Sequence, residues 1–447
     1  MKKKVINLLL AAVLTLALAA CGSRPAGQTA DSGGAAAADE QAGPGTDAGA
    51  GTAWADPVGA GTAGAQAGAV TEPDGPDFRI GIVTGSMAQS EDDRRGAEAF
   101  REKYGEDLVT LAIYPDNFEE ELDTTVQTIV NLAEDPKMKA IIVNQAVPGT
   151  AEAFRQIRQI RPDILCIAGE AHEDIPEIGA VSDLVVLNDF VARGYLIVRS
   201  AHELGCDTFV HISFERHLSY DTIAREVAIM EAACQEFGMT FAMEEAPDPI
   251  TEVGVPGAQA YITEHVPGWL ETYGTRTAFF CTNDAHTEPL IRELLKLGGY
   301  FIEADLPSPM MGYPGALDLD LTEESGDFGK ILRTVEKAVC EKGGAGRFGT
   351  WAYSYSYTVS AGLAEHVRNV ILGEGSLTDI GDIARAFQVF SPSADWNGSK
   401  YIDAETGERV DNTVLIYQDT YIMGNPGYYM GSTRVAVPEK YFTISES

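Results

Sequence analysis

The chain has 447 residues, of which 67 are acidic and 32 are basic, so its formal net charge at neutral pH is −35. A charge of that size repels the phosphates of nucleic acids and of anionic lipid headgroups, so we expect no nucleic-acid partner. The cysteines beyond position 21 are odd in number and far apart, which argues against a disulfide framework and against a zinc site.

The first 21 residues have the pattern of an export signal. Lys2, Lys3 and Lys4 precede an apolar stretch at 5–20 that is shorter than the roughly 20 apolar residues of a membrane span. This stretch runs into Leu18-Ala-Ala-Cys21-Gly, which resembles the lipobox of bacterial lipoproteins. The resemblance implies that Cys21 carries a lipid and anchors the protein to the outer face of the cell membrane. The alternative is an ordinary secretory peptide with a chance cysteine.

Residues 22–77 consist mainly of Gly, Ala, Asp, Thr and Pro, with Trp54 as their only aromatic residue. Such a composition cannot bury enough apolar surface to offset the entropy lost on ordering, so it predicts a disordered tether. The remaining stretch, 78–447, is longer than one hydrophobic core usually supports, and it therefore predicts two lobes.

Short runs rich in Ile and Val alternate with amphipathic segments from residue 78 onward, which predicts α/β lobes with parallel sheets covered by helices on both faces. The expected strands of an N-terminal lobe (78–188) are 79–84, 108–114, 140–144, 164–168 and 184–187, with helices at 92–104, 118–134 and 150–160.

The alternation repeats in a C-terminal lobe (189–325). Its expected helices are 190–204, 220–237, 258–273 and 285–297, and its expected strands are 208–212, 239–244, 278–282 and 300–304. In the last segment, 326–447, we expect helices at 328–340 and 359–372. The portion 385–447 is rich in Tyr, Val and turn residues, and it predicts strands that cross back to brace the lobes.

This chain resembles the type I periplasmic binding proteins, the two-lobed solute receptors of ABC importers, over roughly 78–373. Three stretches carry the resemblance: Phe78-Arg-Ile-Gly-Ile-Val-Thr84 with Gly96-Ala-Glu-Ala-Phe100, Lys139-Ala-Ile-Ile-Val-Asn-Gln145, and Ala278-Phe-Phe-Cys-Thr-Asn283-Asp284 followed by a helix. The resemblance implies two doubly wound lobes joined by hinge crossovers, a small polar solute between them, and an ABC permease as partner.

Parallel sheets bind ligands beyond the carboxyl ends of their strands, so candidate ligand-binding residues stand at those ends. In the first lobe they are Thr84, Ser86, Met87, Asn144, Gln145 and Glu170. In the second lobe they are Phe214, Glu215, Arg216, Asn283 and Asp284, while Asp189 and Arg193 stand with Asn188 where the chain first crosses over.

Several candidates have a structural alternative. Asn283 and Asp284 precede a helix, where either could act as an N-cap. Glu215 and Arg216 could form a surface ion pair with little effect on stability. The aromatic residues of the stretch 351–357 could stack on a sugar ring or pack in the core.

We expect no cofactor, no metal and no catalytic residue. Two matches to the dinucleotide-binding glycine pattern lack the strand, turn and helix that give the glycines their use. His211 and His217 lie near Glu215, but their spacing matches no standard metal site.

The leading hypothesis is a solute-binding lipoprotein that delivers a small neutral or zwitterionic molecule to an ABC permease. The alternatives are a ligand sensor for a membrane signalling protein and a lipid-anchored hydrolase that uses two carboxylates.

Overall fold

The computed structural model describes residues 77–403 and 406–444. The export signal, Cys21 and nearly all of the predicted tether lie outside the described residues. The described residues group into one compact unit. Within the described ranges, no helix combines the length and the apolar character that a membrane span requires.

The first sheet has seven strands in the order β11-β12-β5-β4-β3-β1-β2. Strands β1 (Arg79–Thr84), β2 (Val109–Ile113), β3 (Met138–Asn144), β4 (Leu165–Gly169) and β5 (Leu184–Asn188) are parallel to one another. Strand β12 (Arg409–Gln418) pairs in parallel with β5, and β11 (Trp396–Ile402) pairs antiparallel with β12. The end of the chain therefore completes the sheet that its beginning started.

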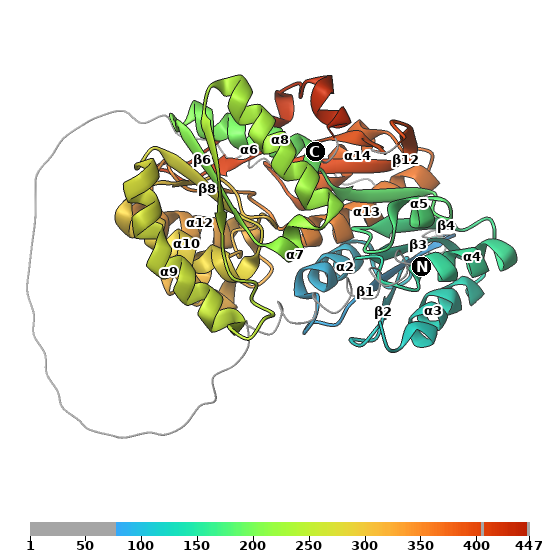
Figure 1. Ribbon diagram of the computed structural model, residues 1–447. Coiled ribbons are helices and arrows are strands. Elements are labelled where there is room, and N and C mark those ends of the chain that lie inside the picture. The colour runs from blue at the N-terminus through green and yellow to red at the C-terminus, as the bar shows by residue number, and fades with distance from the viewer. Residues whose placement is uncertain (1–76, 404–405, 445–447) are drawn as a thin grey trace, which may run out of the picture. The chain divides into compact units, whose positions relative to one another are not determined.

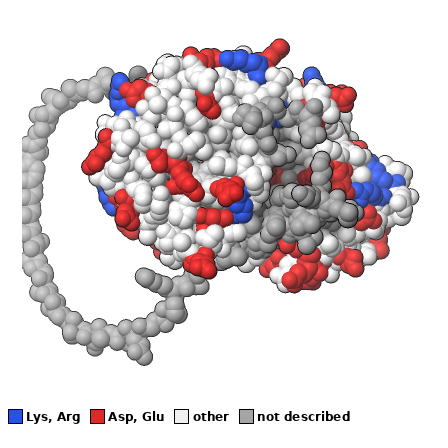
Figure 2. All heavy atoms as spheres, viewed as in Figure 1, with Lys and Arg blue, Asp and Glu red and all other residues white. Residues whose placement is uncertain are grey.

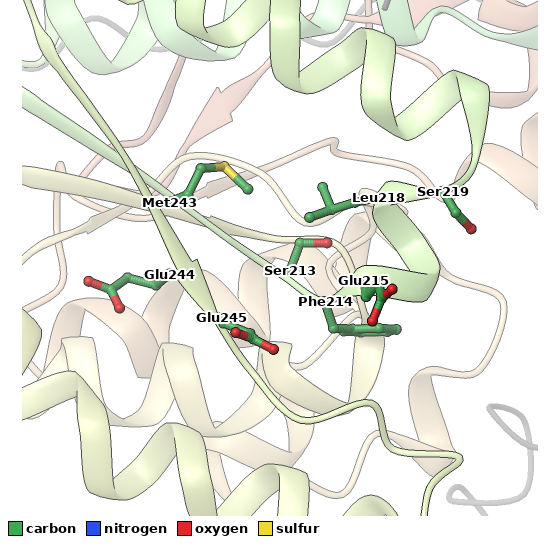
Figure 3. A pocket seen from close by; sticks show the side chains of 8 residues that line it. All are labelled: Ser213, Phe214, Glu215, Leu218, Ser219, Met243, Glu244 and Glu245. Carbon is green, nitrogen blue, oxygen red and sulfur yellow. The ribbon is translucent and has the colours of Figure 1, made fainter.

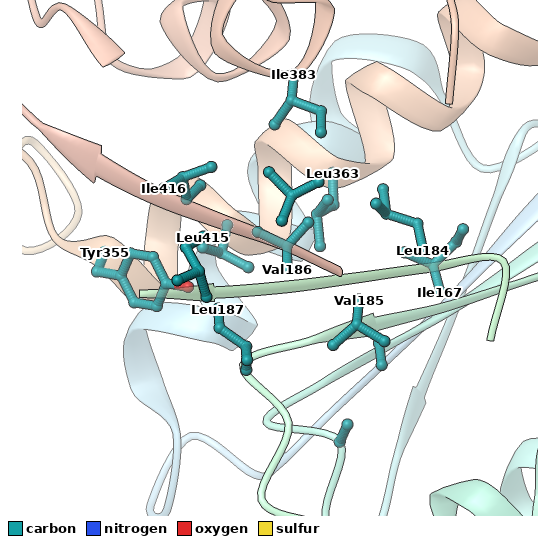
Figure 4. Close-up of a cluster of buried hydrophobic side chains, with 14 of the residues drawn as sticks. Ile167, Leu184, Val185, Val186, Leu187, Tyr355, Leu363, Ile383, Leu415 and Ile416 are labelled. Carbon is teal, nitrogen blue, oxygen red and sulfur yellow. The ribbon is translucent and has the colours of Figure 1, made fainter. Parts of the chain in front are cut away.

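Helices cover the first sheet on both faces (Figure 1). Helices α3 (Leu122–Asn131) and α4 (Thr150–Ile160) pack against each other, and so do α2 (Glu91–Tyr104), α13 (Tyr355–Ile371) and α14 (Ile380–Phe390). The strands are almost continuously apolar because both of their faces are covered. Figure 4 shows side chains of β4, β5 and β12 packed with Leu363 of α13 and Ile383 of α14.

The second sheet has four parallel strands in the order β7-β6-β8-β9. They are β6 (Thr208–Ser213), β7 (Thr240–Glu245), β8 (Thr277–Cys281) and β9 (Tyr300–Phe301). Alternate residues of β6 face opposite sides, so Phe209 packs in the core with α6 (Phe190–Glu203) and α8 (Asp221–Phe237), and Val210 packs with α9 (Gly254–Tyr273) and α10 (Asp284–Leu297).

The chain passes between the two sheets after β5, between β10 (Gly349–Thr350) and α13, and after β12. A small sheet of β10, β13 (Tyr421–Ile422) and β14 (Tyr428–Tyr429) lies at these crossings. The remaining helices are α5 (Ile175–Gly179), α7 (Glu215–Leu218), α11 (Tyr313–Leu317) and α12 (Phe328–Glu341), with short 3₁₀ turns at Leu132–Glu134, Thr322–Glu324, Ser432–Arg434 and Glu439–Thr443. The predicted class, two doubly wound α/β lobes with hinge crossovers, is confirmed. The exact lobe boundaries at 188 and 325 stay predictions.

Two expectations about single elements are wrong. The predicted strand portion from 385 onward begins inside a helix, α14, whose N-cap Asp379 accepts a hydrogen bond from the backbone of Asp382 and whose apolar stripe includes Ile383 and Phe387. The expected strand 300–304 pairs only at Tyr300–Phe301, at the edge of the sheet, and residues 302–304 leave β8 before that strand ends at Cys281.

Candidate functional site

The loop after β1 provides three predicted residues. Thr84 is fully buried and donates a hydrogen bond to the carbonyl of Gly85, and the Ser86 hydroxyl accepts one from the backbone of Ala88. Met87 is exposed. These contacts shape the loop, and a role of the three residues in ligand binding stays a prediction.

Asn144 and Gln145 end β3 and connect the sheet to the helices that cover it. The amide of Asn144 is fully buried and donates to the hydroxyl of Ser360 on α13, at 2.8 Å. Gln145 has a φ of 60° and donates to the carboxylate of Asp93 on α2, at 2.6 Å. Both amides thus hold neighbouring elements in place, and Gln145 also orients an acidic side chain.

Glu170 follows β4 with a φ of 47°, in the left-handed region that a residue other than glycine rarely adopts. Its carboxylate accepts a hydrogen bond from the backbone of Asn188 and lies beside the hydroxyl of Tyr355. Burial raises the pKa of Glu170, although Tyr355, Asn188 and the charge of Arg193 oppose the shift.

Asp189 and Arg193 stand at the start of α6, where the chain first crosses over. Asp189 is the N-cap of α6 and also accepts a hydrogen bond from Ser399, so its carboxylate holds the crossover together. The guanidinium of Arg193 pairs with Glu303 at 3.3 Å, donates to the carbonyl of Ala304 at 2.9 Å, and lies 5.4 Å from the ring centre of Trp351.

On the second sheet, Arg216 is held within its own lobe. Its guanidinium binds both carboxylate oxygens of Asp248, at 2.6 and 2.8 Å, and also donates to Tyr220. The predicted surface pair between Glu215 and Arg216 is therefore wrong, because Arg216 pairs with Asp248 and both side chains are largely buried. A bidentate pair of this geometry leaves little of the guanidinium free for a ligand.

Phe214 and Glu215 line a cavity of about 620 Å³ beyond the ends of β6 and β7 (Figure 3). Its lining residues are Ser213, Phe214, Glu215, Leu218, Ser219, Met243, Glu244 and Glu245. All of them belong to the second lobe. This cavity alone therefore does not bring the two sheets together.

Of the two residues that could cap α10, Asn283 and Asp284, the structure shows Asn283 as the N-cap. Asn283 is the N-cap of α10, and its side-chain oxygen accepts a hydrogen bond from the backbone of Ala285 at 3.0 Å. Asp284 is the first helical residue, and burial raises the pKa of its carboxyl to about 7, with a further upward contribution from the charge of Asp305. The N-cap role thus falls to Asn283, and the carboxylate of Asp284 remains available for another partner.

Three acidic residues near Arg193 were missed by the sequence analysis. Glu303 and Asp305 follow β9, where the strand-end rule would have placed them had the strand not been extended to 304. Glu226 stands within α8, and nothing in its sequence context marks it. The charge of Arg193 lowers the pKa of all three carboxyls, against the upward effect of burial.

Together these residues form one group, which we call the carboxylate cluster. Its members are Glu170, Glu226, Glu303 and Asp305, on which Arg193 acts, together with Asp93 beside Glu170 and Asp284 beside Asp305. Their charges act on one another. The charge of Glu170 raises the pKa of Asp93, and the charge of Glu303 raises that of Glu226. The charge of Asp305 raises the pKa values of three carboxyls, namely Glu170, Glu226 and Asp284. The cluster therefore joins the carboxyl ends of both sheets.

The aromatic stretch 351–357 packs at the crossings. Trp351 is fully buried between Tyr355 and Trp396, while Tyr353 and Tyr357 pack against Phe328 of α12. The packing alternative thus describes these residues in the structure.

The two histidines at and after β6, His211 and His217, have different environments. His211 is fully buried in the strand, and burial lowers its pKa to about 3, whereas His217 contacts the hydroxyl of Thr282. Within the described ranges, no three His, Cys, Asp or Glu side chains are grouped so that they could hold a metal ion.

A family model described as "Protein of unknown function (DUF3798)" matches residues 78–349, and a second family model matches residues 360–444. Two proteins of Treponema pallidum (strain Nichols), both described as uncharacterized, are similar in sequence. One is 41% identical over 208 residues, which are 46% of this chain and 94% of the relative. The other is 38% identical over 179 residues, which are 39% and 81%.

Among solved structures, a putative transcriptional regulator from Clostridium difficile 630 matches with a TM-score of 0.70 at 19% identity, over 77% of this chain and 99% of its own. This likeness supports the shared fold. A sugar ABC transporter chain from Actinomyces odontolyticus ATCC 17982 matches with a TM-score of 0.43 at 10% identity, over 80% of this chain and 98% of its own. A TM-score below 0.5 does not establish a shared fold.

Proposed function

The chain belongs to the family described as protein of unknown function (DUF3798), and we propose that it is an extracytoplasmic binding protein for a small polar solute. In this proposal Cys21 anchors the protein to the outer face of the cell membrane, and an ABC permease receives the solute. A membrane signalling protein is the alternative partner, since import and sensing share the same binding step.

The observation that carries the proposal is the carboxylate cluster. Glu170 follows a strand of the first sheet, Asp284 and Asp305 follow strands of the second, and Arg193 stands at the crossover between them. Groups that converge from two sheets are suited to a ligand that both lobes hold at once, because closing the lobes around it satisfies polar atoms on each side.

A role in nucleic-acid binding is disfavoured by the charge of the chain. Acidic side chains are spread over the face seen in Figure 2, and the formal net charge is −35. The description of the Clostridium protein as a regulator is therefore not carried over, since a surface of this sign repels the phosphate backbone.

The proposal is tested by screening the full chain, purified in detergent, for solutes that raise its melting temperature. A solute that binds only the folded state stabilises it by RT ln(1 + [L]/Kd), so a panel of sugars, nucleosides, amino acids and amines covers the relevant chemistry. Hydrogen exchange then locates the site, with protection expected after β4 and after β8 together. If no solute in the panel binds, or if protection is confined to one lobe, the proposal is wrong.

A further inference from the structure

The charges of the carboxylate cluster are unbalanced. The guanidinium of Arg193 donates hydrogen bonds to Glu303 and to the carbonyl of Ala304. Both Arg193 and Glu303 are buried. The charge of Arg193 acts on the pKa values of Glu170, Glu226 and Asp305, and Asp305 acts on that of Asp284, with no second guanidinium or ammonium among the causes. Ionising a buried carboxyl without a counter-charge is costly, and the cluster thus has more carboxyls than cationic partners.

Glu226 provides an independent observation. Its side chain is 3% exposed, and no hydrogen-bond donor of the described residues reaches its Oε1 atom. Its electrostatic neighbours are Arg193, Asp305 and Glu303, which place this carboxylate at the cluster. A buried acceptor without a donor is rare in a folded protein, because it loses its hydration without compensation. A donor from outside the chain would satisfy this buried oxygen of Glu226.

Solvent reaches part of the cluster. Glu170, Asp284 and Asp305 are only half-buried, whereas Glu226 and Glu303 are buried. Burial nevertheless raises the pKa of all five carboxyls, so protein surrounds even those that solvent touches.

Aromatic side chains stand among these carboxylates. The ring of Trp351 already faces one cation, the guanidinium of Arg193, and the hydroxyl of Tyr355 lies beside Glu170. Aromatic faces attract cations through their quadrupole, and they pack equally well against methylene groups. Carboxylates beside aromatic rings suit an ammonium group on a short carbon chain.

We propose that the cluster binds a small organic amine, whose ammonium groups donate hydrogen bonds to acidic side chains from both sheets. This inference rests on the proposed function and adds the charge class of the solute. An ammonium has three donors and no acceptor, which matches groups that only accept. This proposal departs from the expectation of a neutral or zwitterionic solute; the guanidinium that the carboxylate of a zwitterion would need is already paired with Glu303.

The test compares solutes of one shape and three charges. The full chain is titrated with 1,4-diaminobutane, 1,4-butanediol and succinate, and with the matched series of three, five and six carbons. We expect at least one diamine to raise the melting temperature, and the diols and diacids of equal length to have no effect. Magnesium and calcium chloride are titrated alone, and binding of either metal in place of the amines would overturn the proposal.

Two substitutions that keep side-chain size probe the carboxylates. Glu226→Gln and Asp284→Asn each remove one carboxyl that could ionise beside an ammonium, and we expect each to weaken amine binding at least tenfold. Glu231→Gln is the matched control, because Glu231 is exposed on the same helix as Glu226. We expect it to bind the amine as the unchanged chain does. Melting temperatures of the ligand-free variants at or above that of the unchanged chain separate a binding role from a structural one.

The outcomes separate this proposal from the one on which it rests. If a sugar, nucleoside or amino acid binds with protection in both lobes and no amine does, the amine proposal is wrong and the proposed function stands. If no solute binds, both are wrong. Amine binding that survives both Glu226→Gln and Asp284→Asn also overturns the assignment to the cluster.

Discussion

At the scale of single residues, the carboxyl ends of the strands contain side chains of two kinds. Asn144 and Asp189 are enclosed in hydrogen bonds to Ser360 and to the start of α6, and they hold elements together. Glu170 and Asp284 are half-buried residues whose carboxyls have raised pKa values because of burial. Position in the sequence does not distinguish the two kinds, because all four residues stand at or next to the end of a strand.

Asn283 and Asp284 provide a sharp comparison, because neighbouring residues are assigned different roles. Asn283→Ala removes the N-cap of α10, and we expect it to lower the free energy of unfolding by about 1 kcal/mol with little change in affinity for the solute. Asp284→Ala is expected to weaken solute binding while leaving stability unchanged or higher, since its carboxyl is desolvated. Chemical denaturation and calorimetry on both variants check this. The reverse pattern would assign the cap to Asp284.

Cys21 lies outside the described residues, and its role is tested chemically. We expect Cys21→Ala to abolish the incorporation of labelled palmitate and to release the protein from the membrane fraction, because a diacylated cysteine is the proposed anchor. Cys340→Ala is a suitable control, since Cys340 is a free thiol far along the chain. Palmitate labelling that persists without Cys21 would contradict the lipobox interpretation.

At the scale of elements, the close contact between α2 and α13 depends on a glycine. A Cβ atom at Gly96 would lie 2.3 Å from the backbone carbonyl oxygen of Tyr357 and 2.9 Å from the Cβ of Ser360. The backbone oxygen cannot move aside as a flexible side chain would, so the helices must separate. The glycine at 96 is therefore a packing requirement of the first lobe.

We predict that Gly96→Ala lowers the free energy of unfolding by about 1–3 kcal/mol, the usual cost of overpacking a core. Urea denaturation of the full chain measures the change. Gly268→Ala is the control, because Gly268 lies within a helix and a Cβ atom there would meet nothing within 4 Å. Equal stability of the two variants would show that α2 and α13 have room to adjust.

At the scale of the whole molecule, the cluster makes stability depend on pH. The folded-state pKa values of Asp93 and Asp284 are about 7 and that of Glu226 is about 8, all above the value near 4 of an unfolded carboxyl. A carboxyl with a raised folded pKa retains its full stability contribution only below the unfolded value, and stability falls as the pH rises from there through the folded values, because the folded state then binds more protons than the unfolded state.

We therefore expect the melting temperature of the solute-free chain to fall between pH 6.5 and pH 7.5. Buried His211 and His217 have pKa values lowered to about 3 and about 4, so they are neutral in the folded state there, and their destabilising effect belongs to lower pH. Scanning calorimetry in buffers of matched ionic strength checks the slope, and Glu226→Gln should reduce it. A flat or rising profile would contradict the charge imbalance of the cluster.

The sequence by itself determined the alternation of strands and helices, because apolar runs buried on both faces and amphipathic helices differ in period. Helix 150–160 and strand 79–84 have the predicted bounds. The positions of Glu170 and Asp284 after strands, and of Arg193 at the crossover, were also predicted, while their role in ligand binding stays a prediction. Helix α14 was missed because turn residues surround a short apolar stripe that only packing against α13 and β11 stabilises.

Only the tertiary structure decided which polar residues face one another. Glu226 is one acidic residue of an ordinary amphipathic helix until α8 packs on α6 and places it beside Arg193 and Asp305. Burial, partner and pKa are properties of the space between elements far apart in the chain, and no local pattern encodes them. The sequence thus determined the positions that candidate ligand-binding groups occupy. The packing of the two sheets decided which of these groups lack an oppositely charged partner.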